Sequence, residues 1–215
     1  MDASVSWFLE KRAQAAIKAL EKNRISAEYL ADPTKVAGKV MGLIPAGASV
    51  ATGGSMTLNQ TGVMAAVKSF EQVNFIDRWE QGIEPAELKS RLKRGLTADV
   101  FLSGVNAVTE QGELVFVDAS CTRVAPVLFG PDKVIIVTGC NKIVPDLAYA
   151  QQRIRHFVAP ANAKRLGRKT PCAEDGRCHD CASPDRICNA TVVIHKQAFA
   201  NRMHVIFVGG NSLGL

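Results

Sequence analysis

Four cysteines in one short polar segment are the residues of this chain with the clearest potential for chemistry. Cys172, Cys178, Cys181 and Cys188 follow C-x5-C-x2-C-x6-C spacing within seventeen residues. The residues between them are turn formers and charged residues, which bury little apolar surface by themselves. Because four thiols this close in sequence can meet at one point, a bound metal or iron–sulfur cluster would order the segment.

The spacing leaves the identity of the bound group open. A zinc ribbon normally has two C-x2-C pairs, and only Cys178 and Cys181 form one. A [4Fe–4S] cluster accepts irregular spacing, and a metal-free thiol loop is the third possibility. His179 lies between two of the thiols, where it is able to replace a ligand, but we expect it to face solvent. Cys121 and Cys140 adjoin apolar segments and are predicted to be small buried residues.

A second candidate is the glycine-rich segment 53–57, which follows an apolar strand and leads into a helix. Gly53 and Gly54 let the backbone approach a ligand closely, while Ser55, Thr57 and the first helical amides favour an anion. The pattern matches neither the dinucleotide-binding fingerprint nor the P-loop. A tight strand-to-helix turn with a Ser or Thr N-cap would use the same residues.

Polar side chains also follow the next two predicted strands. The segment 103–113 carries Asn106 and Glu110, and the Glu110 carboxylate is a candidate base or nucleophile. An ordinary solvated turn is the alternative. Asp118 and Arg123 follow the next strand, where Arg123 can hold a carboxylate or phosphate with two hydrogen bonds, or pair with Asp118.

The order of apolar and amphipathic segments predicts the elements that position these residues. Strands are predicted at 26–30, within 45–54, at 73–77, 98–103, 114–118 and 133–139, and in the closing segments TVVIHK and HVIFVGG. Helices are predicted at 4–22, 32–43, 57–70, 85–96, 121–129 and 146–157. This alternation predicts an α/β fold with a mainly parallel sheet, formed by one domain over 1–215. The four-cysteine loop, 170–190, is inserted before the closing strands.

Composition narrows the class of protein. The chain has 215 residues and 47% hydrophobic residues, which suits one globular α/β domain. No apolar run approaches the roughly 20 residues that a membrane-spanning helix needs. The N-terminal segment does not read as a signal peptide, so we expect a cytoplasmic location, where thiols stay reduced and metal binding is favoured over disulfides.

The net charge of +6 favours acidic ligands or phosphates. Part of the excess lies in Lys164, Arg165, Arg168 and Lys169, which would offset a negative thiolate site or form a solvated basic stretch. A nucleic-acid-binding module is disfavoured, because the basic residues are not interleaved with aromatic ones. The sequence does not fix an oligomeric state.

Several motifs in order resemble one family. They are GGSMTL, SGVNAVTEQGELVFVD, TRVAPVLFGPDKVIIVTGCNKIV, RIRHFVAPANAKRL and the cysteine segment ending in SPDRICN. Together, from about residue 10 to 215, they resemble the LUD-domain family, also called lactate utilization protein C-like and formerly a domain of unknown function. The resemblance implies a Rossmann-like three-layer α/β/α domain, similar to the 5-formyltetrahydrofolate cyclo-ligase, sugar-phosphate isomerase and CoA-transferase group.

The resemblance also implies a function. It suggests a role in the oxidation of L-lactate to pyruvate, next to iron–sulfur partner subunits, with a [4Fe–4S] cluster or zinc at the four cysteines. The alternative is an enzyme that acts on a small anionic, acyl or phosphosugar-like substrate with Glu110 as base or nucleophile. The ligand-facing positions that it implies, besides Glu110, are Gly53, Gly54, Ser55, Met56, Thr57, Asn106, Asp118, Arg123, Asn141 and Lys142.

Two segments depart from the pattern of that family. The helix after GGSMTL begins with Asn59 and Gln60, where the family usually has paired acidic residues. The strand-end motif that often reads D-G-T-G-N-R is here 118–123, with Ala119 and Cys121 in place of the glycines. We expect these two side chains to narrow a substrate pocket at that point.

Overall fold

The computed structural model describes residues 2–210 and 213–215. Its α-helices are α1 (Ala3–Lys22), α2 (Val36–Gly42), α3 (Met56–Gln60), α4 (Val63–Ser69), α5 (Pro85–Arg94), α6 (Val124–Leu128), α7 (Leu147–Arg153), α8 (Ala159–Arg165) and α9 (Pro171–Asp175). Its strands are β1 (Ser26–Leu30), β2 (Ser49–Thr52), β3 (Asn74–Phe75), β4 (Val100–Ser103), β5 (Ala107–Thr109), β6 (Leu114–Asp118), β7 (Lys133–Gly139), β8 (Ile143–Val144), β9 (Ala190–Ile194) and β10 (Met203–Val208).

The main sheet contains six strands in the order β1-β10-β7-β4-β2-β3. Every neighbouring pair is parallel. The central strands β4 and β7 are apolar and almost wholly buried, as expected for strands covered on both faces. The predicted three-layer α/β fold with a mainly parallel sheet is therefore confirmed.

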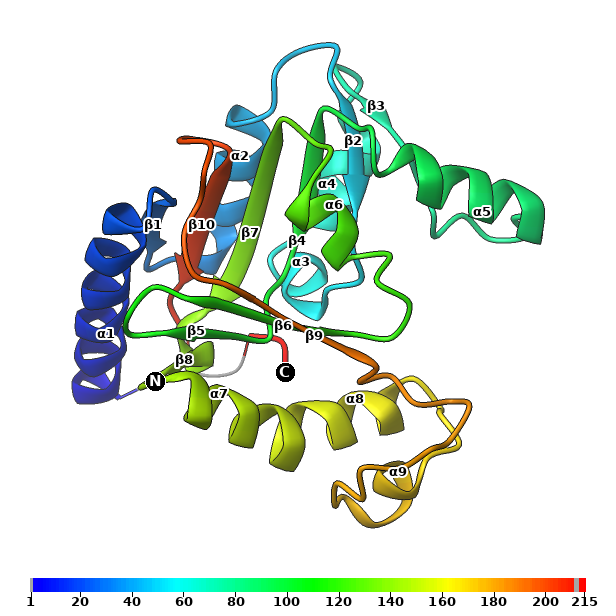
Figure 1. Ribbon diagram of the computed structural model, residues 1–215. Helices are drawn as coiled ribbons and strands as arrows, with labels where there is room; N and C mark the ends of the chain where they lie inside the picture. Colours follow the sequence, from blue (N-terminus) through cyan, green and yellow to red (C-terminus); the bar gives the residue numbers. More distant parts are fainter. Residues whose placement is uncertain (1, 211–212) are drawn as a thin grey trace.

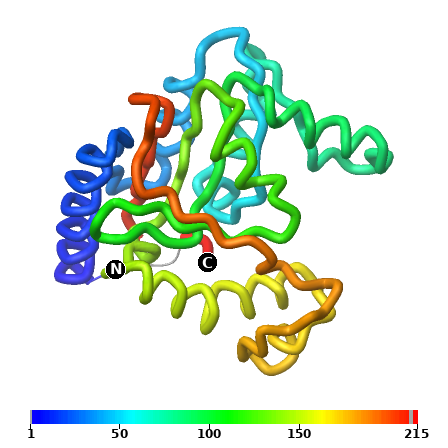
Figure 2. The backbone as a smooth tube through the Cα atoms, viewed as in Figure 1, coloured from blue at the N-terminus to red at the C-terminus, as the bar shows by residue number. Residues whose placement is uncertain are grey.

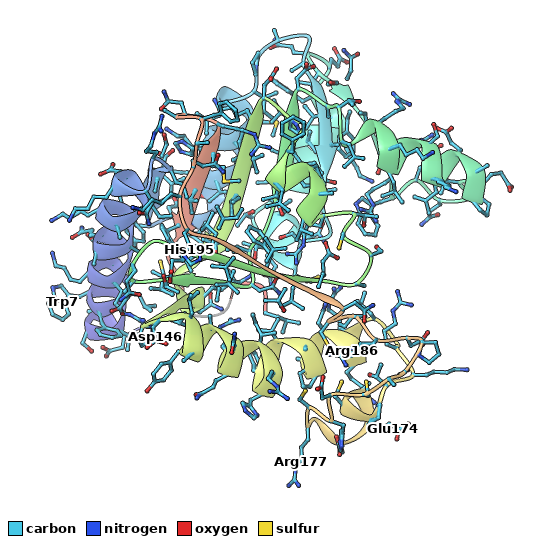
Figure 3. The ribbon with its side chains drawn as sticks, viewed as in Figure 1. Trp7, Asp146, Glu174, Arg177, Arg186 and His195 are labelled. Atoms are coloured by element: carbon cyan, nitrogen blue, oxygen red, sulfur yellow. The ribbon has the colours of Figure 1, made fainter. Side chains whose placement is uncertain are left out.

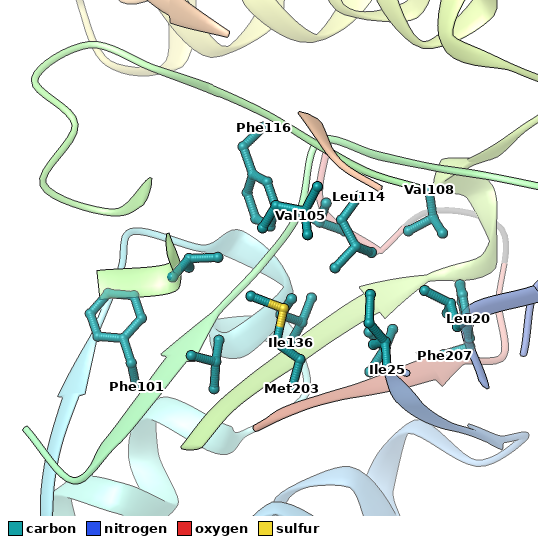
Figure 4. Close-up of a cluster of buried hydrophobic side chains, with 14 of the residues drawn as sticks. Leu20, Ile25, Phe101, Val105, Val108, Leu114, Phe116, Ile136, Met203 and Phe207 are labelled. Atoms are coloured by element: carbon teal, nitrogen blue, oxygen red, sulfur yellow. The ribbon is translucent and has the colours of Figure 1, made fainter. Parts of the chain in front are cut away.

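Two apolar clusters hold layers against the faces of this sheet. On one face, Val40 of α2 and Val67 of α4 pack with Ile135 of β7. On the other face, side chains from β6 and α1 meet Ile136 and Met203 of the sheet (Figure 4). Burying the side chains of these clusters contributes roughly 1.5–3 kcal/mol for each large one, before the loss of chain entropy.

A second sheet, with the order β8-β5-β6-β9, was not predicted. It covers the second face of the main sheet together with α1 (Figure 1). The segment 103–113 was predicted as a polar turn, but Ala107–Thr109 within it forms β5, which is buried and pairs with β6 and β8. The chain turns only after Thr109, at a left-handed Gly112.

Three predicted helices differ in extent. The helix expected at 57–70 is divided into α3 and α4, because Gly62 between them adopts a positive φ of 72°. The helix expected at 121–129 shortens to α6. The helix expected at 146–157 continues through a π-helical turn, Ile154–Val158, into α8. This longer helical segment brings Arg165 next to Met56 of α3, with 3.5 Å between Nη1 and Sδ.

The four-cysteine loop leaves the sheets after α8 and returns at β9 (Figure 2). Glu174, Arg177 and Arg186 lie on this excursion, at the opposite end of the molecule from Trp7 of α1 (Figure 3). That the whole chain forms one domain with this loop as an insert stays a prediction. Over residues 2–210 and 213–215, no helix combines the length and the apolar character that crossing a bilayer requires.

Candidate functional site

A cavity of about 650 Å³ lies where the glycine loop, the strand ends and α8 meet. Gly53 follows β2, Gly104 follows β4 and Lys142 follows β7, so three neighbouring parallel strands open into it. The carboxyl ends of such strands are where open α/β sheets bind ligands. Loop residues after β3 and β6, and residues of α8, complete the wall.

The glycines of the cavity allow protein segments to approach one another. A Cβ atom at Gly53 would lie 2.6 Å from Cγ of Arg123, and one at Gly104 would lie 2.6 Å from Oγ of Ser55. Ser55 caps α3, since its Oγ accepts a hydrogen bond from the Leu58 amide at 3.3 Å. The N-cap interpretation of this loop is therefore confirmed, and the glycines bring the loop against the next two strand ends.

The Arg123 side chain connects the ends of β4 and β6 within the wall of the cavity. Its Nη2 donates to Oδ1 of Asn106 at 2.8 Å and to the Val117 carbonyl at 2.6 Å, and its Nη1 donates to the Gly104 carbonyl at 3.3 Å. The Arg123 Nε lies 3.8 Å from Asp118, and the side chain is only 13% exposed. Protein acceptors occupy both terminal nitrogens of Arg123. Its main role is therefore to position the wall of the cavity, since neither nitrogen is wholly available to a ligand.

Asp118 organises the turn that carries Arg123. Its carboxylate accepts hydrogen bonds from the amides of Ala119, Arg123 and Val124 at 2.8–3.1 Å. Within this turn Cys121 has a φ of 61°, which is the left-handed conformation that glycine adopts easily. Ala119 lines the cavity as expected, but Cys121 does not, since it packs against the main core. The expectation that both side chains narrow the pocket is thus wrong for Cys121.

Replacing Cys121 by glycine is expected to keep or raise the free energy of unfolding, by up to about 1 kcal/mol. A non-glycine residue in the left-handed region costs of order 1–3 kcal/mol, which glycine avoids, although its freer unfolded chain offsets part of the gain. Cys121→Val is expected to lower stability by about 2 kcal/mol, because a β-branched side chain is strained most there. Urea unfolding of both variants tests this, and a glycine variant less stable than the valine variant would contradict it.

Six cationic side chains line the cavity. Three of them are exposed at its rim: Lys68, Arg165 and Arg168. Lys142, in the wall, is 5% exposed, and Arg78 and Arg123 are partly buried. Asp118 is the one carboxylate side chain among the described lining residues. Asn59, at a position where the family pattern has an acidic residue, also lines it. Lys68 pairs with Asp77 at 2.8 Å and Arg123 lies 3.8 Å from Asp118, so the other four cations, which have no ion-pair partner among the described residues, give the cavity its excess of positive charge, which favours anions.

One of these cations, Arg78, stands out by its surroundings. The Nε of Arg78 is buried without a hydrogen-bond partner among the described residues, and burial lowers the pKa of this guanidinium. The guanidinium lies 4.8 Å from the ring of Trp79, whose half-exposed side chain forms part of the cavity beside Gly54. Sequence patterns gave no signal for this pair, because it lies in a loop without periodicity.

The structure brings most of the implied ligand-facing residues together. The cavity is lined by Gly53, Gly54, Ser55, Met56, Asn106, Asp118, Arg123 and Lys142. Thr57 does not line it, but its Oγ1 lies 3.2 Å from Nζ of Lys142. Asn141 lies outside the lining, with its Oδ1 buried and unpaired among the described residues. Arg165 and Arg168, expected either to offset the thiolates or to form a solvated basic stretch, line the cavity and are exposed.

Glu110 lies apart from this cavity. Its Oε1 accepts hydrogen bonds from Nη2 and Nε of Arg12 in α1, at 2.8 and 3.0 Å, and its side chain is 41% exposed. The cavity lining does not include it. The geometry gives Glu110 the surroundings of a half-exposed surface ion pair, so its catalytic role stays a prediction without support from its position.

The four cysteines share one loop that polar contacts order. Arg186 donates to the carbonyls of Cys181 and Cys188 at 2.6 and 3.2 Å and to Asp180 at 2.8 Å. Burial raises the pKa of the Cys188 thiol, and the neighbouring Cys178 and Cys181 add to the increase while Arg186 opposes it. His179 pairs with Asp175 at 2.8 Å.

The part of the chain that the structure describes holds no preformed metal centre. Within residues 2–210 and 213–215, no three side chains of His, Cys, Asp or Glu are grouped so that they could hold a metal ion. Cys172 lies in α9, where its thiol contacts Oγ1 of Thr170 at 3.4 Å. The chemistry of four thiols suits a cluster or zinc, but their arrangement among the described residues does not fit either group.

Comparison with protein families agrees with the sequence motifs. Residues 13–208 match the LUD domain. The chain belongs to the LUD domain family. A search of curated proteins gives no match.

Solved structures agree at the level of the fold. A DUF162 family protein from Deinococcus radiodurans superposes on this LUD-domain chain with a TM-score of 0.54 at 14% identity, covering 94% of this chain and 98% of that one. Two more distant similarities are eIF2B beta from Chaetomium thermophilum and ribose 5-phosphate isomerase A from Neisseria gonorrhoeae. The first has a TM-score of 0.37 at 16% identity and covers 54% of this chain and 44% of its own. The second has a TM-score of 0.34 at 12% identity and covers 54% of each chain.

Proposed function

We propose that this LUD-domain protein binds and converts a small polyanionic molecule in the cavity at the strand ends. The observation that carries the proposal is that six cationic side chains and one carboxylate side chain line the cavity, and that four of these cations have no ion-pair partner among the described residues. Such an excess raises the local concentration of anions and offsets the cost of removing their charge from water. A phosphate ester or a molecule with several carboxylates fits this chemistry.

The volume of the cavity favours a ligand larger than lactate. A cavity of about 650 Å³ falls within the range of roughly 300–1,000 Å³ that accommodates cofactors and drug-sized ligands. A three-carbon acid would fill only a small part of it. A role in the oxidation of lactate or another hydroxy acid to its oxo acid remains part of the proposal, supported by membership of the LUD domain family, and it would need a larger acid or a second bound component.

The positions of the charges suggest how such a ligand is held. The rim residues Arg165 and Arg168 attract the anion, and they are screened by salt because they are exposed. Lys142 and Arg78 in the wall meet it where water is scarce, so their contacts contribute more per charge. The ring of Trp79 offers a surface on which a planar part of the ligand can stack.

Pyrophosphate is expected to bind with one site per chain, and binding is expected to weaken as salt is added. Replacing both rim residues, Arg165→Gln with Arg168→Gln, is expected to weaken it about tenfold at low salt, since two charges that meet the anion are lost. Isothermal titration calorimetry measures the effect. Lys93→Gln with Arg94→Gln removes the same charge from α5, outside the cavity, and is the matched control.

Equal losses in the two double variants would show that only net charge matters, which would contradict a site in the cavity. Absence of pyrophosphate binding at low salt would also contradict the proposal. Lactate and pyruvate in the same titration test the hydroxy-acid role, because a lactate protein should bind one of them and lose it in the rim variant.

We also propose that the four cysteines acquire a metal or a [4Fe–4S] cluster when the loop closes further. The proposal is supported by their spacing and by the presence of all four as free thiols in one loop. Protein purified without oxygen is expected to contain iron and acid-labile sulfide, and the Cys181→Ser variant is expected to lose both. Zinc in place of iron would assign a structural site. Metal-free wild-type protein would contradict metal binding.

A further inference from the structure

Lys142 is a buried amine that pairs with no carboxylate of the described residues. It ends the turn after β7, its side chain is 5% exposed, and it lines the cavity. Its Nζ lies 3.2 Å from Oγ1 of Thr57 and 3.4 Å from the carbonyl of Val105, and both acceptors are neutral. No ion pair involves it among the described residues. Buried lysines are rare, and an unpaired one is costly as a purely structural group.

The charges around this amine favour its neutral form. Burial, together with the guanidiniums of Arg153 and Arg123, lowers the pKa of Lys142 to about 7. Arg153 is fixed beside it, because its Nη1 donates to the Asn106 carbonyl at 2.9 Å. A desolvated lysine next to other cations is the environment in which an amine becomes a nucleophile at neutral pH.

We propose that Lys142 is a nucleophile that forms an imine with the carbonyl carbon of an anionic aldehyde or ketone bound in the cavity. The inference rests on the proposed anion site, which would hold the charged part of that substrate. It assigns the substrate a second feature, a reactive carbonyl group. Arg165 and Arg168 at the rim and Arg78 in the wall would attract the anionic part, while the carbonyl carbon approaches Nζ.

The step balances without an oxidant or reductant. The lone pair of Nζ attacks the carbonyl carbon, forming the C–N bond, and the carbonyl oxygen takes up a proton. The nitrogen then loses its protons as the C–O bond breaks, and the oxygen leaves as water. The resulting imine, once protonated, withdraws electrons from the neighbouring carbon and so makes its proton or carboxylate easier to remove. Hydrolysis reverses the step and frees the amine.

Labelling with pyridoxal 5′-phosphate, an anionic aldehyde, followed by reduction with sodium borohydride tests the proposal. Peptide mapping by mass spectrometry is expected to find one reduced adduct on Lys142, formed at least tenfold more efficiently than with pyridoxal, which lacks the phosphate. Inorganic phosphate is expected to suppress it. The rate of labelling is expected to level off above about pH 7, whereas ordinary lysines continue to gain reactivity toward pH 10.

Variants separate a nucleophile from a structural lysine. Lys142→Arg keeps a cation and is expected to lose the adduct, whereas Lys133→Arg, in the same strand region but outside the cavity lining, is expected to keep it. Labelling spread over surface lysines with Lys142 unmodified would overturn the imine. If pyrophosphate still binds in that case, the anion site stands and only the imine fails. If Lys142 is labelled equally by pyridoxal and no anion binds, the anion site fails instead.

Discussion

Replacing Arg123 by methionine is expected to lower the free energy of unfolding by about 3 kcal/mol, because several buried acceptors lose their donor. The guanidinium donates to Asn106, Val117 and Gly104, which belong to two separate strand ends. Methionine fills a similar volume but donates no hydrogen bond. Urea unfolding measures the loss, and a change below about 1 kcal/mol would show that the three strand-end contacts contribute little to stability.

A substitution at Gly53 tests the position of the Arg123 side chain from the glycine loop that packs against it. Gly53→Ala introduces a Cβ 2.6 Å from Cγ of Arg123, near the fixed base of that side chain, and overpacking of this kind costs about 1–3 kcal/mol. Gly54→Ala is the matched control, since its Cβ would make an ordinary contact 3.5 Å from the Trp79 ring. Equal stability of the two alanine variants would contradict the role assigned to Arg123.

Replacing Lys142 by methionine is expected to remove the pH dependence of anion binding. In the wild-type protein the Lys142 amine, with a pKa of about 7, is charged below that pH and attracts an anion, and it is neutral above it. Affinity for sulfate is therefore expected to fall by up to about tenfold for each pH unit above about 7, until the pKa of the complex is reached. Sulfate keeps its charge in this range, so the protein alone causes the change.

The other groups that face this amine do not titrate in that window. These groups are two guanidiniums: burial lowers the pKa of Arg153 to about 10 and also lowers that of Arg123, and arginine side chains keep their proton in proteins at neutral pH. At pH 6, Lys142→Met is expected to bind sulfate at least tenfold more weakly than the wild type does. The affinity of the variant for sulfate is expected to stay the same at all pH values. A persisting pH dependence in the variant would contradict this assignment.

The same shift has a consequence for stability. The unfolded chain has an ordinary lysine with a pKa near 10.5, whereas the folded chain has one near 7. Between these values the unfolded state binds more protons, so the free energy of unfolding gains a contribution that rises with pH. Lys142→Met lacks this contribution and should fold at least as well as the wild type at pH 6, because no charge is buried. Loss of anion binding in the variant would then report on the site itself.

The main sheet was predictable because its strands are marked in the sequence. Segments such as 133–139 are continuously apolar, and such runs are typical of parallel strands covered on both faces. The second sheet was not predictable, because β5 has three residues and lies between polar ones. Gly62, which ends α3, reads as an ordinary helical residue until its positive φ is known.

The candidate site was predictable in part for a similar reason. Residues after parallel strands must meet at one edge of the sheet, and Gly53 and Asn106 do so, whereas Asp118 reaches the cavity from β6 of the second sheet. Arg78 and Arg165 reach the same cavity from a loop and from a helix that continues further than its pattern indicates. Glu110 looked equivalent to Asn106 in sequence, but β5 separates the two and carries Glu110 toward α1.

A crystal soaked with selenate provides the most direct measurement of the central claim, that the cavity at the strand ends is an anion site. The anomalous difference map is expected to show a peak inside the cavity, within hydrogen-bond distance of Lys142 or of the arginines that line it. Peaks confined to the outer surface, with none in the cavity, would contradict the claim.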